Sequence, residues 1–583
     1  MQNLYIKELG KKILFSYTRS RIIIIVLLAF LSFPVAAQNY IVNSNLDAPA
    51  VNLVTGETAV PGQITLRSAI QAATAQPGAH IITFSGAVVS PINLSLGQIT
   101  VGNAANGNNI TINGPGMALL TVNQTTDNRV FSTGTGAVTF VLTDITLNFT
   151  GPGAVPYSGG GGAIIAGGAS ASTTLTNVTI TNFNQQIGNG GAISQSSSLN
   201  IHTLVITNCV FTNNRCGGAG GAVSFNSQGG TATIDGVTFT NNHTGVVGAN
   251  TGGDGGATAT TGGGAGGTYT ISRNHYINNQ VENVTGHAGA IMNTNGALTA
   301  AHNRFIGNTC LNVANPPLAN IIGQASGTGP NSTVADNNWW SVNTGPGAND
   351  ATFLGGGAGS MTVTKWLQLK TTASPNPICN TAATGNTTTV TTSFLSNSAS
   401  EAILVANLPR LIGLPVTWGP TTLGSLSGQQ GNIQASGTAT ATFTSNGTGG
   451  TATVNTQVDN VPAGETTPSR ANITVNTASV APTGATGTTT VCSGGTTTLT
   501  VTGGIKGTSA VTQWYTGSCG GTLVFTGDAF TTPALVISTT YFVRYNGVCN
   551  ITTCATVIVT VNDVTGGTVG SDQTICSGGD PAA

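Results

Sequence analysis

The stretch Val237-Thr238-Phe239-Thr240-Asn241-Asn242 decides the fold, because the chain repeats it. Related phrases end at Asn182, Asn214, Asn279 and Asn308. Each phrase has one large apolar anchor two or three positions before its first asparagine. The anchors are spaced 31, 28, 37 and 29 residues apart, and they are Ile180, Phe211, Phe239, Tyr276 and Phe305. Self-similarity at a period of roughly 20 to 50 residues indicates a solenoid of stacked repeats.

The local pattern of each phrase decides which kind of solenoid forms. Apolar residues alternate with Thr, Ser or Asn over four to six positions, which is the period of a strand. No segment keeps a helical stripe for three turns, so helical repeats are excluded. Stacked strands place residues of the same phase about 4.8 Å apart. We therefore expect the anchors to form an internal apolar stack, and the asparagines to form a hydrogen-bonded ladder at a left-handed turn.

A second phrase, Gly-Gly-Ala-(Ile/Val), falls between the anchors. It occurs at residues 161–164, 190–193 and 220–223, with looser forms at 255–257 and 289–291. Paired glycines mark turns that need a positive φ or a close approach of two backbones. Together the two phrases predict a right-handed parallel β-helix over residues 81–370, with nine or ten coils of about 30 residues.

The open ends of such a β-helix need covers, because an uncapped coil is a strand edge that recruits other chains. Residues 64–73 have helix-forming composition and apolar positions at i, i+3 and i+4, and they predict a helix in an N-terminal cap spanning residues 38–80. At the far end, Trp339 and Trp340 precede Asn343-Thr344-Gly345-Pro346. We expect this aromatic pair to close the stack.

Both ends are similar to a known group. Residues 64–73 resemble the Leu-Arg-x-Ala-Ile segment that opens bacterial surface β-helix proteins of the CSLREA type, and residues 338–346 resemble the Asn-Trp-Trp…Gly-Pro motif that closes them. The resemblance covers roughly residues 40–370 and departs at Ile64 and Ser68, where that pattern has Cys and Glu. It implies an exported, adhesin-like surface protein and no catalytic residues.

Beyond about residue 380 both phrases stop, and short strands at sandwich spacing follow. One Ig-like β-sandwich is expected at 380–476, with strands at 388–394, 402–406, 416–418, 438–445 and 450–458. Its residues 437–454 resemble the end of the Ig-like domains of invasin-type proteins. A second, disulfide-containing sandwich is expected at 483–562, and it resembles Ig-like modules of Bacteroidetes surface proteins. Ile575-Cys576-Ser577-Gly578-Gly579 repeats Val491-Cys492-Ser493-Gly494-Gly495, which predicts the start of a further, truncated module at 563–583.

The N-terminus and the cysteines predict export. Five basic residues precede an apolar run at 22–33 and the small-residue site Val35-Ala36-Ala37, which is the pattern of a signal peptide over residues 1–37. An exported chain can form disulfides. Cys492, Cys519, Cys549 and Cys554 cluster in one stretch and are expected to staple one small domain, with three possible connectivities. The sequence has no CxxC pair, which argues against a zinc site.

The charge content restricts the chemistry. The 583 residues include only 16 Lys+Arg and 17 Asp+Glu, or 6% charged residues against about 25% in ordinary domains. The chain therefore has no basic footprint for nucleic acid. Glycoside hydrolysis needs two carboxylates about 5 to 10 Å apart, and a lyase needs an acidic calcium cluster with a nearby base. The carboxylates of the coil region are Asp127, Asp144, Asp235, Asp254, Glu282, Asp336 and Asp350, and no pair of them recurs at one phase.

We therefore assign no catalytic, cofactor-binding or metal-binding residue from the sequence. If a catalytic site exists, the best cluster is Asp235 or Asp254 with His243 or Arg273. Residues 252–256, Gly-Gly-Asp-Gly-Gly, are similar to a calcium-binding turn but occur once. The six histidines share no phase, which argues against a metal stack.

The sequence thus predicts an all-β chain, a right-handed parallel β-helix followed by tandem Ig-like β-sandwich modules. Its expected function is that of an extracellular or outer-membrane-associated adhesin without catalysis, binding glycans or a host or neighbouring cell surface through a neutral Asn/Thr/Ser-rich face. No transmembrane span is expected after signal removal. The alternatives are a β-helix carbohydrate-active enzyme, either a polysaccharide lyase or a glycosidase, and a structural surface spacer.

Overall fold

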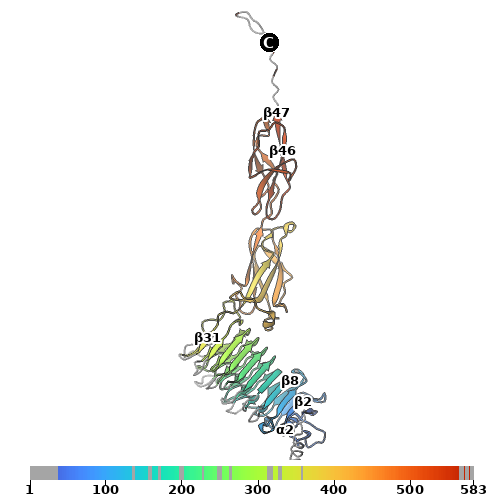
Figure 1. Cartoon of the computed structure of the whole chain (residues 1–583), viewed down its shortest axis with the longest axis vertical. Helices are drawn as coiled ribbons and strands as arrows, with labels where there is room; N and C mark the ends of the chain where they lie inside the picture. The colour runs from blue at the N-terminus through green and yellow to red at the C-terminus, as the bar shows by residue number, and fades with distance from the viewer. Residues whose placement is uncertain are drawn as a thin grey trace, which may run out of the picture. The chain divides into compact units, whose positions relative to one another are not determined.

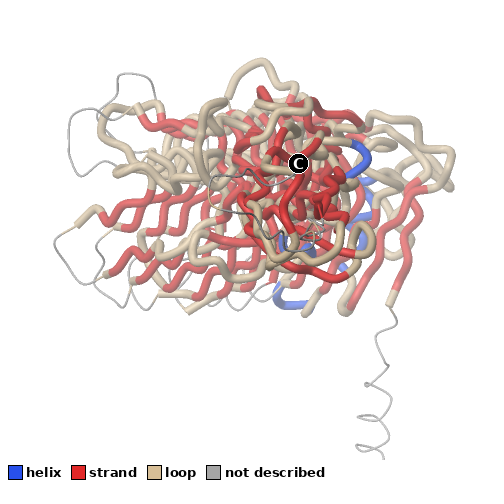
Figure 2. Tube along the Cα trace, turned by 90° about the horizontal axis from the view of Figure 1, so that it is seen from above, coloured by secondary structure: helices blue, strands red, loops and turns tan. Residues whose placement is uncertain are grey.

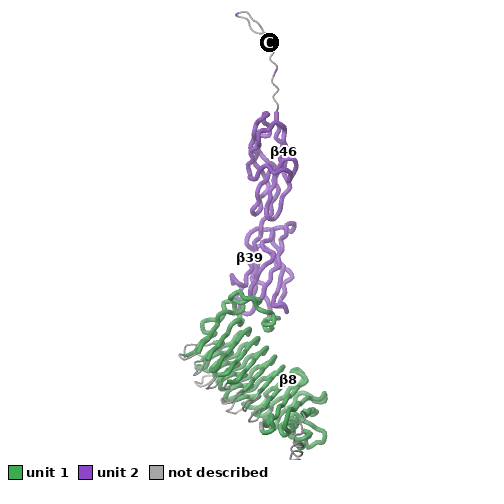
Figure 3. The backbone as a smooth tube through the Cα atoms, viewed as in Figure 1, with its two compact units in different colours: residues 1–368, 394–412 green, residues 369–393, 413–583 purple. Residues whose placement is uncertain are grey.

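A computed structural model shows the fold of the chain. It describes residues 37–562 except 134–137, 155–159, 168–171, 196–201, 226–228, 246–252, 262–265, 312–319, 326–330 and 356–358, and also describes residues 567, 570 and 577. The chain divides into two compact units (Figure 3): the first comprises residues 1–368 and 394–412, and the second residues 369–393 and 413–583. The predicted signal peptide, except Ala37, and nearly all of the predicted further module lie outside the described residues.

The first unit is a parallel β-helix, as predicted (Figures 1 and 2). Within the described residues, its largest sheet has 17 strands in two adjoining parallel ladders. The first ladder comprises β1 (Gln38–Val42), β2 (Ala79–Phe84), β5 (Asn109–Asn113), β8 (Thr139–Phe149), β10 (Ser172–Thr181), β13 (Thr203–Thr207), β17 (Thr231–Asp235), β21 (Thr268–Ser272), β25 (Ala297–Ala301), β29 (Ser332–Val334) and β31 (Ser360–Thr362). The second comprises β3 (Ile92–Leu94), β6 (Thr121–Gln124), the far halves of β8 and β10, β14 (Val210–Thr212), β18 (Thr238–Thr240), β22 (His275–Ile277) and β26 (Arg304–Ile306).

Two smaller sheets complete the coils. A nine-stranded sheet comprises β4 (Ile99–Val101), β7 (Phe131–Thr133), β9 (Ile164–Ala166), β12 (Ile193–Gln195), β16 (Val223–Phe225), β20 (Thr258–Thr260), β24 (Ile291–Asn293), β28 (Ile322–Gln324) and β30 (Ala351–Phe353). A five-stranded sheet comprises β11 (Asn184–Gln185), β15 (Arg215–Cys216), β19 (His243–Thr244), β23 (Gln280–Val281) and β27 (Thr309–Cys310). The paired strands are parallel and in register from coil to coil.

The apolar anchors form the predicted internal stack. Ile180 pairs with Phe211, Phe211 with Phe239, Phe239 with Tyr276 and Tyr276 with Phe305. The aromatic rings are stacked with centroids 4.8 to 5.2 Å apart. This distance is close to the strand spacing, so each ring covers the ring of the coil before it.

The asparagines divide into two roles, where the sequence predicted one column. Asn213, Asn241 and Asn278, the first of each pair, have the left-handed backbone, with φ between 52 and 56°. The second of each pair points inward, and Asn214, Asn242, Asn279 and Asn308 form a buried asparagine ladder. Along it each side-chain amide donates to the Oδ1 of the next asparagine at 2.9 to 3.1 Å. The left-handed residue bends the strand, so that the inward-pointing side chain is the one after it, three positions after the anchor instead of two.

The Gly-Gly phrase also serves two purposes. The first glycine of each pair, Gly161, Gly190 or Gly220, has a φ between 71 and 75°. The second lies against the backbone of the next coil, since a Cβ on Gly191 would stand 2.1 Å from the carbonyl oxygen of Gly221. Both predicted reasons for the glycines are therefore confirmed, one at each position of the pair.

A helix lies at the N-terminal end of the β-helix, as predicted. Helix α2 (Leu66–Ala75) begins with a capping box, in which Thr65 and Ser68 each accept the other's backbone N–H. The Ser68 hydroxyl supplies the acceptor that a Glu or Gln commonly supplies at this position of a capping box. Arg67 is buried and pairs with Asp47, with Nε 2.6 Å from Oδ1. A short 3-10 helix, η1 (Ala104–Asn106), follows.

The C-terminal end is closed by more than the tryptophan pair. Trp340 stacks on Phe305 with centroids 5.1 Å apart and so continues the aromatic stack, while Trp339 packs edge-on against Phe394. Phe394 begins the segment 394–412, which the sequence assigned to the first sandwich. The strand predicted at 402–406 is wrong: the region forms a single bridge at Ala402 and the 3-10 helix η3 (Val405–Asn407). The region belongs to the first unit, where Ile403 is buried and Leu404 is exposed.

The described residues of the second unit form two β-sandwiches. One sheet of the first sandwich comprises β32 (Leu367–Ser374), β34 (Thr387–Asn397), β37 (Thr438–Ser445) and β36 (Gly424–Ser427). Its other sheet comprises β33 (Ile378–Cys379), β39 (Arg470–Asn476), β38 (Gly450–Gln457) and β35 (Thr417–Thr421), and the 3-10 helix η2 (Ala382–Thr384) lies between β33 and β34 in the chain. One sheet of the second sandwich comprises β40 (Gly484–Thr486), β42 (Thr498–Thr502) and β45 (Ala529–Thr531). Its other sheet comprises β41 (Thr490–Cys492), β47 (Ala555–Asn562), β46 (Thr539–Asn546), β43 (Val511–Thr516) and β44 (Thr522–Thr526). Each sandwich has its own apolar core, and Trp514 is buried in the second.

Candidate functional site: a neutral face on the β-helix

The outward side of the first ladder presents rows of small neutral residues. We call this surface the threonine face and define it as the first two outward positions on β8, β10, β13, β17, β21 and β25. Its members are Thr139, Val141, Ser172, Thr174, Thr203, Val205, Thr231, Thr233, Thr268, Thr270, Ala297 and Thr299. The register places each residue directly beside its counterpart on the next coil. All twelve are uncharged, and those on β17, β21 and β25 are exposed.

The hydroxyl groups of this face lie close enough to interact along the rows. The Oγ1 of Thr231 donates to the Oγ1 of Thr203 at 3.4 Å, and the Oγ of Ser172 donates to the Oγ1 of Thr139 at 3.2 Å. A hydroxyl has one donor and two acceptor positions, so a bonded row still offers acceptors to solvent. The surface therefore presents methyl and hydroxyl groups at the spacing of neighbouring strands, about 4.8 Å.

One edge of the threonine face has a charged pair from the predicted cluster. Arg273 donates to Asp235 through two bonds, from Nη2 to Oδ2 at 2.6 Å and from Nε to Oδ1 at 2.8 Å, and Ser272 donates to the same Oδ1. Burial raises the pKa of Asp235, but the hydrogen bonds from Arg273 and Ser272 and the charge of Arg273 outweigh burial, so the net pKa lies below its ordinary value. The carboxylate of Asp235 is thus held by protein groups.

His243, the other base of the predicted cluster, lies elsewhere. Its Nδ1 is 2.8 Å from Oε1 of Glu282, and Arg215 donates from Nη1 to the same oxygen at 3.3 Å. We call Arg215, His243 and Glu282 the lateral charged cluster. The sequence reasoning missed it, although a signal existed: Arg215 and His243 each follow the second asparagine of a phrase, and the register pairs them on β15 and β19.

Asp254 belongs to neither group. It lies in the turn before β20, and its Oδ1 accepts the backbone N–H of His287 at 2.8 Å. Burial raises the pKa of this carboxyl above its ordinary value. Among the described residues, no group of three or more His, Cys, Asp or Glu side chains has the geometry to hold a metal ion. Gly252 of the calcium-like turn lies outside the described residues. The structure therefore divides the predicted cluster among three separate places.

The comparisons with known proteins concern the sandwiches. Residues 480–562 match the family model of the Ig-like domain, CHU_C associated. No curated protein matches the chain. Among the described residues no helix is long and apolar enough to cross a membrane.

Solved structures to which the chain is similar include two bacterial proteins and a titin fragment. The Yersinia pseudotuberculosis adhesin InvE is 21% identical over 33% of this chain and 58% of its own, with a TM-score of 0.17. Invasin, a bacterial integrin-binding protein, is 16% identical over 34% of this chain and 42% of its own, with a TM-score of 0.21. The titin fragment I67–I69 is 12% identical over 34% and 66%, with a TM-score of 0.22. The chain spans about half the length of the first two structures.

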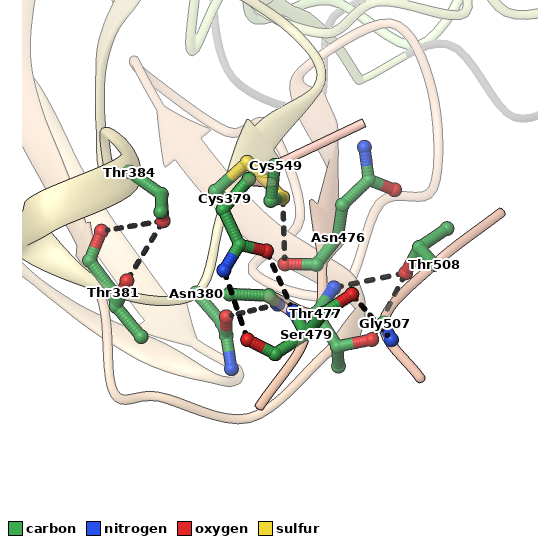
Figure 4. Close-up of a disulfide and its surroundings, with 12 residues drawn as sticks. Cys379, Asn380, Thr381, Thr384, Asn476, Thr477, Ser479, Gly507, Thr508 and Cys549 are labelled. Carbon is green, nitrogen blue, oxygen red and sulfur yellow. Dashed lines mark hydrogen bonds between the residues drawn. A yellow bond between two sulfur atoms is a disulfide. The ribbon is translucent and has the colours of Figure 1, made fainter. Parts of the chain in front are cut away.

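The disulfides of the CHU_C-associated Ig-like domain correct the predicted pairing. Cys519 and Cys554 are joined within the domain, but Cys549 is joined to Cys379 of the preceding sandwich (Figure 4), and Cys492 is free and exposed. The four clustered cysteines therefore do not staple one domain. Cys549 lies in the loop between β46 and β47, where it meets the previous sandwich.

Proposed function

We propose that this chain is an exported, cell-surface, adhesin-like protein whose threonine face binds neutral glycans. The observation that carries the proposal is the threonine face itself: rows of uncharged hydroxyl and methyl groups in register over six strands. The two disulfides support export, since disulfides persist in oxidising compartments. The predicted signal peptide agrees with this location.

The chemistry of the face favours a neutral sugar polymer over a charged ligand. A glycan offers hydroxyl groups and C–H surfaces, which match threonine hydroxyl and methyl groups. Each hydrogen bond formed in water contributes only about 0.5 to 1.5 kcal/mol net. Affinity then comes from many equivalent contacts, because a ligand held at one coil meets the next coil at high effective concentration.

The test replaces threonines in the middle of the face. Thr233 and Thr270 are exposed partners on adjacent coils, and the double variant Thr233→Lys/Thr270→Lys places two long charged side chains within one row of the face. Binding of the full chain to immobilised neutral polysaccharides and to a glycan array is expected to fall at least tenfold. The matched control is Thr500→Lys on β42, an exposed strand position in the second sandwich, which is expected to bind like the parent.

Other outcomes separate the alternatives. Unchanged glycan binding by the double variant contradicts the role of the threonine face. Absence of any glycan binding by the parent chain favours a structural spacer. Turnover of pectin, alginate or a neutral glycan that is lost in Glu282→Gln or Asp254→Asn favours the carbohydrate-active enzyme.

A further inference from the structure

Cys379 and Cys492 occupy the same position in the two sandwiches. Each is the last residue of a short strand that pairs in parallel with the final strand of its own sandwich. Ile378 and Cys379 pair with Val475 and Asn476, and Val491 and Cys492 pair with Val561 and Asn562. Both cysteines therefore lie beside the asparagine at which the chain leaves the sandwich.

In the first sandwich this position is a docking point for the next one (Figure 4). Cys379 is bonded to Cys549, with Cα atoms 5.7 Å apart. Near the disulfide, the Oδ1 of Asn380 accepts the backbone N–H of Ala478 at 2.8 Å. The backbone N–H of the linker residue Thr477 donates to the Oγ1 of Thr508 at 2.9 Å, and the carbonyl oxygen of Thr477 accepts the backbone N–H of Thr508 at 3.0 Å. Asn550, next to Cys549, accepts the N–H of Ser479 and donates to its carbonyl oxygen. We call Cys379, which lies beside the last residue of its sandwich, the exit cysteine. The junction thus consists of this exit cysteine, the linker, and a loop cysteine of the following sandwich.

In the second sandwich the equivalent cysteine has no disulfide partner among the described residues. Among the described residues, Cys492 is exposed, whereas Cys209, Cys216 and Cys310 are buried or half-buried in the β-helix. An exposed cysteine left over in a chain that forms disulfides indicates either a pairing partner or a reactive thiol.

We propose that Cys492 is a second docking point, which forms a disulfide with the β46–β47-loop cysteine of another Ig-like module of the same type. The occupant is defined by the first junction, where Cys549 of such a module is bonded to the equivalent cysteine. The bond forms when the two thiols lose two protons and two electrons. The oxidant is a small-molecule disulfide such as oxidised glutathione, which is reduced to two thiols.

The test supplies a further module within the full chain. In a tandem variant, residues 477–562, with Cys492 of the copy changed to Ser, are inserted a second time between Asn562 and Asp563, so that the natural linker follows the exit asparagine again. The variant is oxidised in a glutathione buffer, alkylated without reduction and mapped by mass spectrometry. We expect a disulfide between Cys492 and the inserted copy of Cys549, and a loss of at least tenfold in alkylation of Cys492.

A matched control changes the inserted Cys549 to Ser. In that control Cys492 is expected to be alkylated as fully as in the parent. Linkage of the inserted Cys519 and Cys554 reports that the new module has folded. A folded module beside a fully alkylated Cys492 overturns the proposal.

The parent chain gives a second, independent measurement. In it Cys492 is expected to react with iodoacetamide while Cys379 and Cys549 stay linked. A disulfide between Cys492 and Cys576 in the parent overturns the proposal, because Cys492 then cannot bond to a β46–β47-loop cysteine.

Discussion

Replacing Asn242 by Leu tests how much the buried asparagine ladder stabilises the β-helix. Asn242 is fully buried, and its side chain takes part in four hydrogen bonds. Its Nδ2 donates to the carbonyl oxygen of Phe211 at 3.0 Å and to Oδ1 of Asn279 at 2.9 Å. Its Oδ1 accepts the backbone N–H and the side-chain N–H of Asn214, both at 3.1 Å. Leucine has a similar branched shape but can make none of these bonds.

The expected cost follows from the groups that lose a partner. Two buried N–H groups of Asn214 lose their acceptor, and an unsatisfied buried donor costs about 1 to 3 kcal/mol. The variant no longer has to desolvate the amide of Asn242 and buries more apolar surface, which offsets about 1 to 2 kcal/mol. We therefore expect Asn242→Leu to lower the free energy of unfolding by about 1 to 4 kcal/mol.

The assay combines equilibrium unfolding in guanidinium chloride with hydrogen exchange at the backbone amide of Asn214. The variant is expected to unfold at lower denaturant and to exchange this amide faster than the parent. The control is Asn241→Gly, which keeps the left-handed backbone (φ 52°) and is expected to change stability by less than about 0.5 kcal/mol. An Asn242→Leu chain with the parent's midpoint and the parent's exchange rate would refute the ladder as a net source of stability.

Three further predictions concern other parts of the chain. Gly191→Ala is expected to cost at least about 2 kcal/mol in a thermal unfolding comparison, since its Cβ would meet the carbonyl of Gly221 at 2.1 Å, while Gly86→Ala, with open space around it, is neutral. Burial raises the folded-state pKa of Asp254, so the folded state binds the carboxyl proton more tightly than the unfolded state does. The free energy of unfolding therefore falls as pH rises from about 4 through that raised pKa. We expect Asp254→Asn to remove this pH dependence, measured as the midpoint of urea unfolding at each pH. Cys519→Ser is expected to destabilise the CHU_C-associated Ig-like domain by about 2 to 4 kcal/mol, whereas Cys379→Ser leaves that domain's midpoint unchanged and speeds proteolysis of the linker at 477–483. Equal effects of the two cysteine variants on the domain's midpoint would contradict the separate roles.

The coil was predictable because its pattern is local and repeated. Phe211, Phe239 and Tyr276 share one phase of a two-residue period, and stacking converts that phase into a column. The division of labour within Asn241-Asn242 was not predictable from alternation. Alternation from Phe239 points Asn241 inward, yet its left-handed backbone turns the strand so that Asn242 takes the inward place. A pattern of residue types does not record where the backbone bends.

The candidate site was predicted only in part, for a related reason. The sequence offered Asp235 or Asp254 with His243 or Arg273 as the best cluster, and the structure brings Asp235 and Arg273 together. Glu282 was missed because it is 39 and 67 residues from His243 and Arg215, and only the coil register brings the three together. The cysteines show the same limit more strongly. Cys549 lies five residues from Cys554 but pairs with Cys379, 170 residues away, because pairing depends on distance in space.

The low charge of the chain has a structural consequence for binding. Several of the few charged side chains are consumed by internal pairs, including Arg67 with Asp47, Arg273 with Asp235 and Lys506 with Asp528. The threonine face is left without a charge of its own. Attraction between exposed charges is screened within about 8 to 10 Å at physiological salt, but hydrogen bonds and methyl contacts are not. Binding by this face should therefore persist at high salt, and strong salt dependence would point to the lateral charged cluster of Arg215, His243 and Glu282 instead.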